Sequence, residues 1–405
     1  MKFQKIISAA AAALILFSAS AIPVSAEQSV KGEVIAPFAA KLSDVDTMID
    51  IPVSADVSSI DEAAASMRAA MKSRTNQFYI VIPKSGFADG DDAAMRMLAE
   101  AMKETSSGTE GDYLRFVMKS YRYKFQEDRS NYAISYEIGY YTTAEQEQET
   151  DRKVAAITDY YSLYNRSKFE IIRAVYDYIS ENVVYAEVDM NEEQQSDLSI
   201  FTAYGAAVKG TAVCQGYAEL FYRLLKDAGI SCRIISGTSR GVRHTWNIAE
   251  IDGLYYLLDP TWDSILGGSD GAFFMKGSDD FDELSSVVTH VPVYEYETIF
   301  SDYESEEFKK EYPLSPVRLE FPVYTTGDVD GNGMIDGRDA SSVLAAYAIA
   351  SVGKAYPFCK DQIYASDVTG DGVTDGKDAS RILSFYAASS AGKADDINDF
   401  LKNRT

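Results

Sequence analysis

Residues suited to nucleophilic and acid–base chemistry at neutral pH are scarce in this sequence, which has three cysteines and two histidines among 405 residues. Three cysteines are too few for a disulfide scaffold, and their odd number leaves at least one thiol free even in an oxidising compartment. Basic residues are also in deficit, because 38 lysines and arginines face 62 aspartates and glutamates. Such an acidic surface argues against nucleic acid and an anionic membrane as partners.

A long apolar run lies near the N-terminus, over residues 6–22. Two lysines precede this run, and small residues ending at Ala26 follow it, which is the pattern of a secretory signal peptide. No stop-transfer pattern follows, so we expect cleavage and export rather than a membrane span. The sequence therefore predicts that residues 1–26 are removed and that the protein is secreted and extracellular.

The rest of the chain is long enough for two or three domains. Apolar spacing predicts an N-terminal α/β region over 27–143, with helices at 61–73 and 91–104 and strands at 77–83 and 132–143. This region carries no recognisable chemistry, and we expect a scaffold or specificity domain. Helical spacing begins at residue 144 and opens a second domain, 144–300. Charge and prolines indicate a linker at 301–326, whose end could form a strand packed on the preceding domain. This leaves 327–405 as a C-terminal module.

The C-terminal module contains a duplication, since residues 327–348 and 366–387 match at 12 of 22 positions. Each copy has oxygen-bearing side chains at loop positions 1, 3, 5, 9 and 12, a glycine at 6 and a carbonyl at 7, which is calcium-loop spacing. The expected ligands are Asp328, Asp330, Asn332, Met334, Asp336 and Asp339 in the first copy, and Asp367, Thr369, Asp371, Val373, Asp375 and Asp378 in the second. We expect two structural Ca²⁺ ions, the second held more weakly because Thr369 is neutral.

Both loops end in aspartate, a short helix is expected after each, and no long helix is expected before the first. The pair resembles a dockerin over residues 327 to about 400, a module that attaches an exported enzyme to a cohesin domain of a cellulosome scaffolding protein. The resemblance implies a small all-α calcium-binding domain with cohesin contacts from Arg338, Ala340, Ser341, Lys377, Ala379 and Ser380. The similar copies would allow two binding orientations. A calcium-stabilised domain without a partner is the alternative.

The segment "GTAVCQGYAELFYRLLKDAGI" at 210–230 has apolar residues at helical spacing. With Thr211 as cap, Cys214 would lie in the first turn, where free backbone N–H groups and the helix dipole stabilise a thiolate. Gly216 leaves room for a substrate or another backbone. From this segment alone, Cys214 could be a nucleophile, half of a disulfide with Cys232, or a small core residue.

A hairpin is expected downstream, because the Asp-Gly pair at 252–253 is a strong two-residue turn signal. Counting outward from that turn, Trp246 would face Asp259. His244 would face Thr261 two residues farther along each strand. Side chains two apart share a face, so His244 and Asp259 would be diagonal neighbours within reach of each other.

The motifs "GTAVCQGYAELFYRLLKDAGI", "CRIISGT" and "HTWNIAEIDGLYYLLDPTWD" resemble the transglutaminase-like superfamily over roughly residues 144–300. The resemblance implies an α+β fold with a papain-like core and catalysis without a cofactor. It makes Cys214 the nucleophile, His244 the general base and then acid, and Asp259 the group that orients the imidazole. The Cys214 backbone N–H would contribute to the oxyanion hole, whose side-chain donor is unassigned.

The other candidate residues have simpler expected roles. We expect Cys232 to be a buried structural thiol and His290 to be solvated. Trp246 and Trp262 should line the site, and Cys359 has no assigned role.

The predicted protein is thus a secreted, cellulosome-bound cysteine protease or peptide amidase that acts on a protein or peptide through a thioester. A protein-crosslinking transglutaminase and a non-catalytic binding module are alternatives. The substrate is not identified by the sequence.

Overall fold

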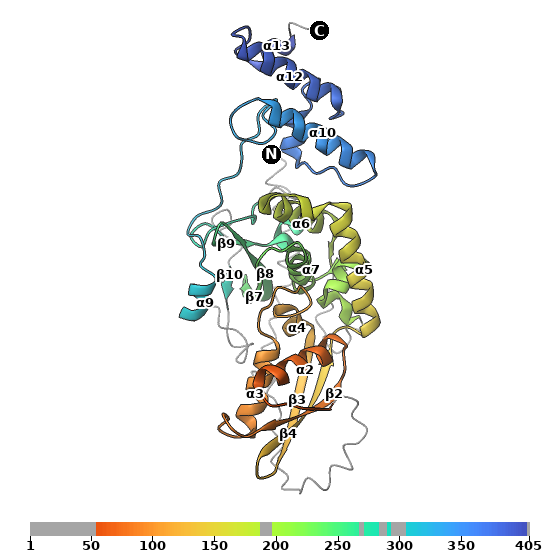
Figure 1. Ribbon diagram of the computed structural model, residues 1–405, viewed down its shortest axis with the longest axis vertical. Helices are drawn as coiled ribbons and strands as arrows, with labels where there is room; N and C mark the ends of the chain where they lie inside the picture. Colours follow the sequence, from red (N-terminus) through yellow and green to blue (C-terminus); the bar gives the residue numbers. More distant parts are fainter. Residues whose placement is uncertain (1–53, 187–196, 267–270, 283–289, 293–304, 403–405) are drawn as a thin grey trace. The chain divides into compact units, whose positions relative to one another are not determined.

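The computed structural model describes residues 54–186, 197–266, 271–282, 290–292 and 305–402 (Figure 1). The predicted signal peptide lies outside these ranges. Among the described helices, none has the length and hydropathy that a membrane crossing requires. The chain divides into two compact units, of which the first contains residues up to Val154 and Tyr176–Arg318 and the second contains Ala155–Val175 and the chain from Leu319.

The N-terminal part of the first unit is a four-stranded sheet of order β1-β2-β4-β3, with helices α2 and α3 beside it (Figure 1). Its elements are β1 (Ser54–Asp56), α2 (Ile60–Lys72), β2 (Gln77–Pro83), α3 (Gly90–Ala101), α4 (Asp112–Val117), β3 (Met118–Glu127) and β4 (Asn131–Tyr140). The predicted helices and strands are all present. β3 was not predicted, because its sequence MKSYRYKFQE is largely polar and only Tyr121 and Tyr123 are buried.

The second sheet of this unit, order β10-β7-β8-β9, carries the proposed catalytic motifs. The remaining elements before the repeats are α5 (Ala144–Tyr160), η3 (Leu163–Asn165), α6 (Lys168–Asn182), β5 (Val184–Tyr185), η5 (Leu198–Phe201), η6 (Gly205–Lys209), β6 (Thr211–Ala212), α7 (Cys214–Asp227), β7 (Cys232–Ser239), β8 (Val242–Ile251), β9 (Leu254–Leu258), α8 (Pro260–Leu266), β10 (His290–Pro292) and α9 (Glu306–Glu311). α7 lies beside β7 and β8 (Figure 1) and buries the apolar face that its spacing predicted.

The N-terminal region is joined to this second sheet by a buried ion pair. The Arg233 guanidinium donates to both carboxylate oxygens of Asp112, over 2.8 and 3.0 Å. The Ile234 backbone N–H also donates to Asp112 over 2.7 Å. The Arg233 guanidinium and the Asp112 carboxylate are therefore both hydrogen-bonded, and a buried ion pair is stable only when its charged groups are bonded in this way. The described residues of the expected 27–143 domain therefore belong to the same compact unit as the second sheet.

The predicted linker at 301–326 is wrong for its described residues before 319. Phe308 of α9 and Tyr312 are buried with Trp246 and Tyr255 in one apolar cluster. Leu314 then pairs with Tyr255 in a parallel β-bridge. The charged residues of α9 that indicated a linker are exposed, whereas Phe308 and Tyr312 complete the core.

The C-terminal repeats have the same local structure twice. Helices α10 (Gly337–Ser351) and α12 (Gly376–Ser390) pack on each other, with α11 (Lys360–Ser366) and α13 (Ile397–Lys402) completing this part. Asp336 and Asp375 cap the two long helices with nearly equal backbone angles, and each forms a capping box. The duplication read from the sequence is thus a duplication of backbone geometry.

Two of the expected cohesin contacts are corrected by this packing. Ala340 and Ala379 are each 1% exposed and belong to the core of the repeats, so a partner cannot reach them. Arg338, Ser341, Lys377 and Ser380 are exposed. The two alanines lie on the inward faces of α10 and α12, where the two helices pack on each other. Small side chains fit there.

Candidate functional site

Cys214 is the first residue of α7. β6 pairs in parallel with β5 and leads directly into Val213, the N-cap, so Thr211 belongs to a strand and does not cap the helix as predicted. Gly216 leaves room for another part of the backbone, as the second of its two expected roles required. A Cβ at this position would lie 2.7 Å from the Thr202 carbonyl oxygen. The thiol therefore lies where unpaired helical N–H groups favour an anion.

His244 is brought to the site by the predicted hairpin. The β8–β9 ladder pairs Ile251 with Leu254 and continues to Leu258, which confirms the register. The turn residues at 252–253 both have positive φ, 53° and 85°, as a two-residue hairpin turn requires. The predicted pairs beyond Leu258 do not form, because Pro260 begins α8 and proline has no N–H for the ladder.

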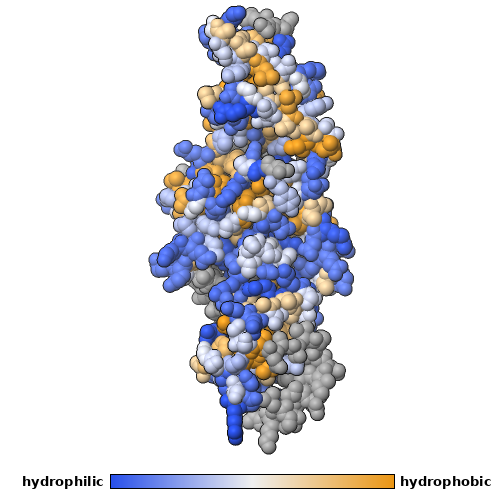
Figure 2. Space-filling model, viewed as in Figure 1, coloured by the Kyte–Doolittle hydropathy of each residue, from blue (hydrophilic) through white to orange (hydrophobic). Residues whose placement is uncertain are grey.

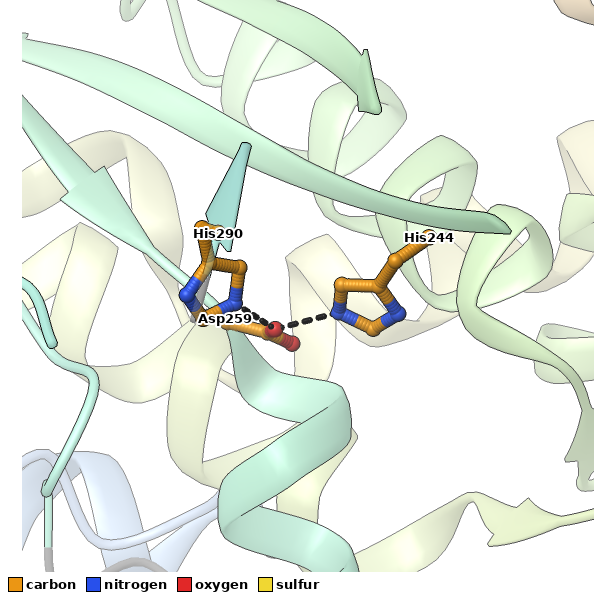
Figure 3. Close-up of side chains that lie close together, drawn as sticks. All are labelled: His244, Asp259 and His290. Carbon is orange, nitrogen blue, oxygen red and sulfur yellow. Dashed lines mark hydrogen bonds and ion pairs between the residues drawn. The ribbon is translucent and has the colours of Figure 1, made fainter. Parts of the chain in front are cut away.

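Asp259 nevertheless lies against His244. The imidazole Nε2 is 2.5 Å from Asp259 Oδ2, and both side chains are buried (Figure 3). The other carboxylate oxygen accepts from the backbone N–H groups of Thr261 and Trp262, at 2.9 and 3.2 Å, in the first turn of α8. A carboxylate held by a helix N-terminus in this way has a fixed direction, which fixes the imidazole in turn.

The second nitrogen of His244 points away from Asp259 (Figure 3). Burial alone would lower the pKa of His244, but its interactions with Asp259 and then with Cys214 raise this pKa to about 10. The pKa of Asp259 is held below its usual range, because the His244 and His290 contacts outweigh its burial. This raised pKa favours an imidazolium at His244 at neutral pH, held by the Asp259 carboxylate. The structure thus brings His244 and Asp259 into direct contact, and Cys214 lies near enough to affect the pKa of His244.

His290, predicted to be solvated, is a buried neighbour of this group. Its side chain is 1% exposed, and its Nε2 lies 3.0 Å from the Asp259 oxygen that also binds His244 (Figure 3). The sequence prediction failed because β10 pairs with β7, a partner far away in the sequence. The Asp282 carboxylate, also missed, binds the other ring nitrogen of His290 at 2.6 Å.

Aromatic rings wall the imidazole of His244. Trp246 stacks on it with ring centroids 6.0 Å apart, and Trp262 lies at 5.9 Å, as was expected of both. The Trp262 indole donates to Ser239 Oγ at 3.1 Å, which holds the ring in place. Water is thereby excluded from much of the imidazole, and electrostatic interactions there are strengthened.

The other two cysteines are not in the site. Cys232 begins β7, is fully buried and has a pKa raised well above its usual value by burial, so it is an inert structural thiol. Cys359 caps α11. All three thiols are free, so the alternative of a disulfide between Cys214 and Cys232 does not hold in this structure.

Tyr185 is a further neighbour of the thiol that the sequence did not indicate. It pairs with Ala212 two residues before Cys214, and its ring lies 6.4 Å from that of Tyr217, one turn after Cys214. Its pKa is raised first by burial of the hydroxyl and then by the charge at Cys214, although 40% of the residue is exposed. Tyr185 is therefore a partly exposed phenol on the strand that pairs with the residues just before Cys214.

The first C-terminal loop brings three carboxylates together. Ligand atoms of Asp328, Asp330 and Asp339 all lie within 4.8 Å of one another. Burial raises the pKa of Asp339, and the nearby Asp330 raises it further. Carboxylates at such distances repel one another, so the donor set, with Asp328 and Asp339 buried and Asp330 exposed, fits a hard divalent cation with oxygen ligands.

The second loop repeats the fold of the first with a weaker donor set. Asp367 accepts from the N–H of Gly372 at 2.9 Å, and Gly372 has a φ of 82°, matching 81° at Gly333 in the first loop. At position 3, Thr369 donates its hydroxyl to Asp378 at 3.0 Å, where the first loop has a carboxylate. A neutral residue at this position leaves the second loop with less negative charge.

Part of the chain resembles a described family. Residues 155–260 match the model of the Transglutaminase-like superfamily, and this stretch includes all three triad residues. The chain is 26% identical over 190 residues to the kyphoscoliosis peptidase of Mus musculus and 26% identical over 187 residues to that of Homo sapiens. These matches cover 44% and 43% of this chain and 27% of each relative, so the chain spans about a quarter of those proteins.

Two solved structures are also similar. One is described as a crystal structure of a TGase, with a TM-score of 0.28, 12% identity, and coverage of 53% of this chain and 57% of that one. The other is a putative cysteine protease from Cytophaga hutchinsonii, with a TM-score of 0.23, 17% identity, and coverage of 32% and 53%.

Proposed function

We propose that the transglutaminase-like domain of this chain is a cysteine hydrolase that cleaves amide bonds in a protein or peptide. The observation that carries the proposal is the Asp259–His244 contact, with Cys214 acting on the same imidazole from the start of α7. Nucleophilic catalysis needs a thiolate, a proton carrier and a group that orients the carrier, and these three residues can supply them.

The proposed reaction proceeds in two steps. The Cys214 thiolate attacks the amide carbonyl carbon, and His244 gives its proton to the departing amine as the C–N bond breaks, leaving a thioester. Water then gives a proton to His244 and adds to the thioester, and Cys214 leaves as thiolate when the C–S bond breaks. The Cys214 N–H at the helix start and the Tyr185 hydroxyl are the candidate donors to the oxyanion.

The experiment that tests this function compares peptide release with amine incorporation on casein, using Cys214→Ala as the blank. Peptide release that disappears in the variant supports a hydrolase. Incorporation of a labelled amine without peptide release would instead support a crosslinking transglutaminase. Neither activity on casein or on a peptide library would support the non-catalytic binding module.

We also propose that the C-terminal repeats are a dockerin that binds calcium and a cohesin, in a secreted protein whose first 26 residues are a signal peptide. Leu344 and Tyr347 on α10 are each 47% exposed, and their repeat equivalents Leu383 and Tyr386 on α12 are 45% and 44% exposed. Figure 2 shows hydrophobic surface over these helices. Two equivalent apolar faces suit a partner that can bind in either of two orientations.

Calcium removal is expected to lower the melting temperature of the repeats. Since binding to the folded state alone stabilises it by about 2.7 kcal/mol at a ligand concentration of 100 times Kd, the calcium-dependent shift should be several degrees. Asp339→Asn should reduce this shift more than Asp378→Asn, because the first loop has three clustered carboxylates. Calorimetry with calcium and with EGTA measures the shift, and an unchanged melting temperature in the wild type would contradict calcium binding.

A further inference from the structure

We propose that His290 is a positioning residue of the catalytic site, which extends the triad into a chain running Asp282–His290–Asp259–His244. The inference rests on the proposed function, because it concerns how that triad is held. His290 lies beyond residues 155–260, the segment that the family model matches.

The hydrogen bonds of His290 fix both of its ring nitrogens. Nε2 is 3.0 Å from Asp259 Oδ2, and Nδ1 is 2.6 Å from Asp282 Oδ1. The His290 backbone N–H also donates to the second Asp282 oxygen, at 2.8 Å, so the aspartate binds ring and backbone together. Asp259 Oδ2 thus lies between two imidazoles, as Figure 3 shows.

Packing leaves the ring no freedom to turn. The centroid of Phe281 lies 4.2 Å from that of His290, with Trp246 at 5.1 Å and Phe273 at 5.6 Å. Trp246 also stacks on His244, so one indole contacts both imidazoles. A ring clamped between aromatic neighbours and bonded at both nitrogens can hold the Asp259 carboxylate in one orientation.

The charge of His290 follows from its partners. Each ring nitrogen faces a carboxylate, and only an imidazolium can donate to both. Burial acts against this charge, but Asp259 and Asp282 raise the pKa of His290 above its usual value, while the charge of His244 opposes them. Asp279 and Lys309 line a cavity of about 600 Å³ that also borders His290 and Asp282.

A cation at His290 would have two effects on the triad. It stabilises the ionised form of Asp259, which keeps the carboxylate ready to orient His244. It also repels the His244 imidazolium, so that His244 gives up its proton to the leaving amine more readily. A residue that only fills the core would produce neither effect.

The test uses nuclear magnetic resonance, because the chain has two histidines and their ring Cε1–H signals can be assigned with one variant each. His290→Gln keeps a donor for Asp259 but no charge, so the pKa of His244 should rise. Asp282→Asn should lower the pKa of His290 and raise that of His244. Both variants should lower kcat about tenfold to a hundredfold, the loss expected from one charge-assisted hydrogen bond, with little change in KM.

Phe281→Leu is the matched control, since it removes packing beside His290 but no polar contact. It should lower the melting temperature and leave the pKa of His244 unchanged. If the two polar variants also leave this pKa unchanged, or alter kcat no more than Phe281→Leu does, His290 is structural and the proposal is wrong. The resonance titration needs no substrate, so its result is independent of whether the domain hydrolyses amides. Should His290→Gln fail to fold, Asp282→Asn decides the question, because Asp282 is one-third exposed.

Discussion

Cys214→Ala should lower amide hydrolysis by at least about 10⁴-fold, because the thioester cannot form without the sulfur. The fold should survive, since Cys214 is a small residue at the end of a helix and is 9% exposed. A stability loss of about 1 kcal/mol is expected from the deleted atom. Release of peptides from casein measures the activity, and urea unfolding measures the stability.

Cys232→Ala is the matched control for this substitution. Cys232 is fully buried, and its Sγ lies 3.8 Å from the Asn247 amide, away from the imidazole. This variant should lose stability and keep kcat within about threefold of the wild type, since a buried structural thiol is chemically inert. Full activity in Cys214→Ala would contradict the assignment of Cys214 as the nucleophile. Loss of activity in Cys232→Ala alone would contradict it as well.

Asp259→Asn should impair both activity and stability. The amide can no longer stabilise the His244 imidazolium, and amidation of the orienting carboxylate in a serine-protease triad lowers kcat by about 10⁴-fold. Asp259 is fully buried and binds two imidazoles and two backbone N–H groups. Loss of one partner of a buried ion pair costs about 3 to 5 kcal/mol of unfolding free energy.

The Asp259–His244 pair should make the free energy of unfolding depend on pH. The pKa of His244 rises on folding from near 6.5 to about 10, so its contribution is complete below pH 6.5 and is lost as pH rises to 10. The wild type should lose up to about 1.4 kcal/mol per pH unit from this group in that window. In Asp259→Asn this slope should be much smaller, because the main charge that raises the His244 pKa is gone.

Asp263→Asn is the matched control for Asp259→Asn. Asp263 is a buried carboxylate in α8 that accepts from the Tyr176 hydroxyl at 2.5 Å. Burial raises its pKa to about 7, so this carboxyl has finished titrating by about pH 8, below most of the range in which His244 titrates. Asp263→Asn should therefore keep the wild-type slope between about pH 8 and 10. Equal slopes in all three proteins would show that Asp259 does not control the protonation of His244.

The sequence predicted the parts of the site that depend on local rules. The Asp-Gly turn at 252–253 determines the β8–β9 register, and that register brings His244 close to Asp259 even though β9 ends at Leu258. The helical spacing after residue 214 placed Cys214 at a helix start, although the N-cap is Val213. Both inferences needed only residues within one turn or one hairpin.

The parts that the sequence did not predict depend on distant pairing. Tyr185 is brought opposite Ala212, two residues before Cys214, by the parallel β5–β6 pair. His290 reaches Asp259 because β10 pairs with β7, some fifty residues earlier in the chain. A three-residue strand is too short to show a hydrophobic periodicity from which it could be predicted. The linker prediction failed for the same reason, since the aromatic residues of α9 become buried only when the second sheet is present.

The central claim is that His244 activates Cys214 as the nucleophile, and the rate of Cys214 alkylation at pH 6 tests it most directly. Iodoacetamide is added to the calcium-loaded protein, and peptide mass spectrometry follows modification at each of the three cysteines in the wild type and in His244→Ala. The account predicts rapid alkylation of Cys214 in the wild type, at least about tenfold slower alkylation in the variant, and slow modification of Cys232 in both. Equal, slow alkylation of Cys214 in the two proteins would contradict it.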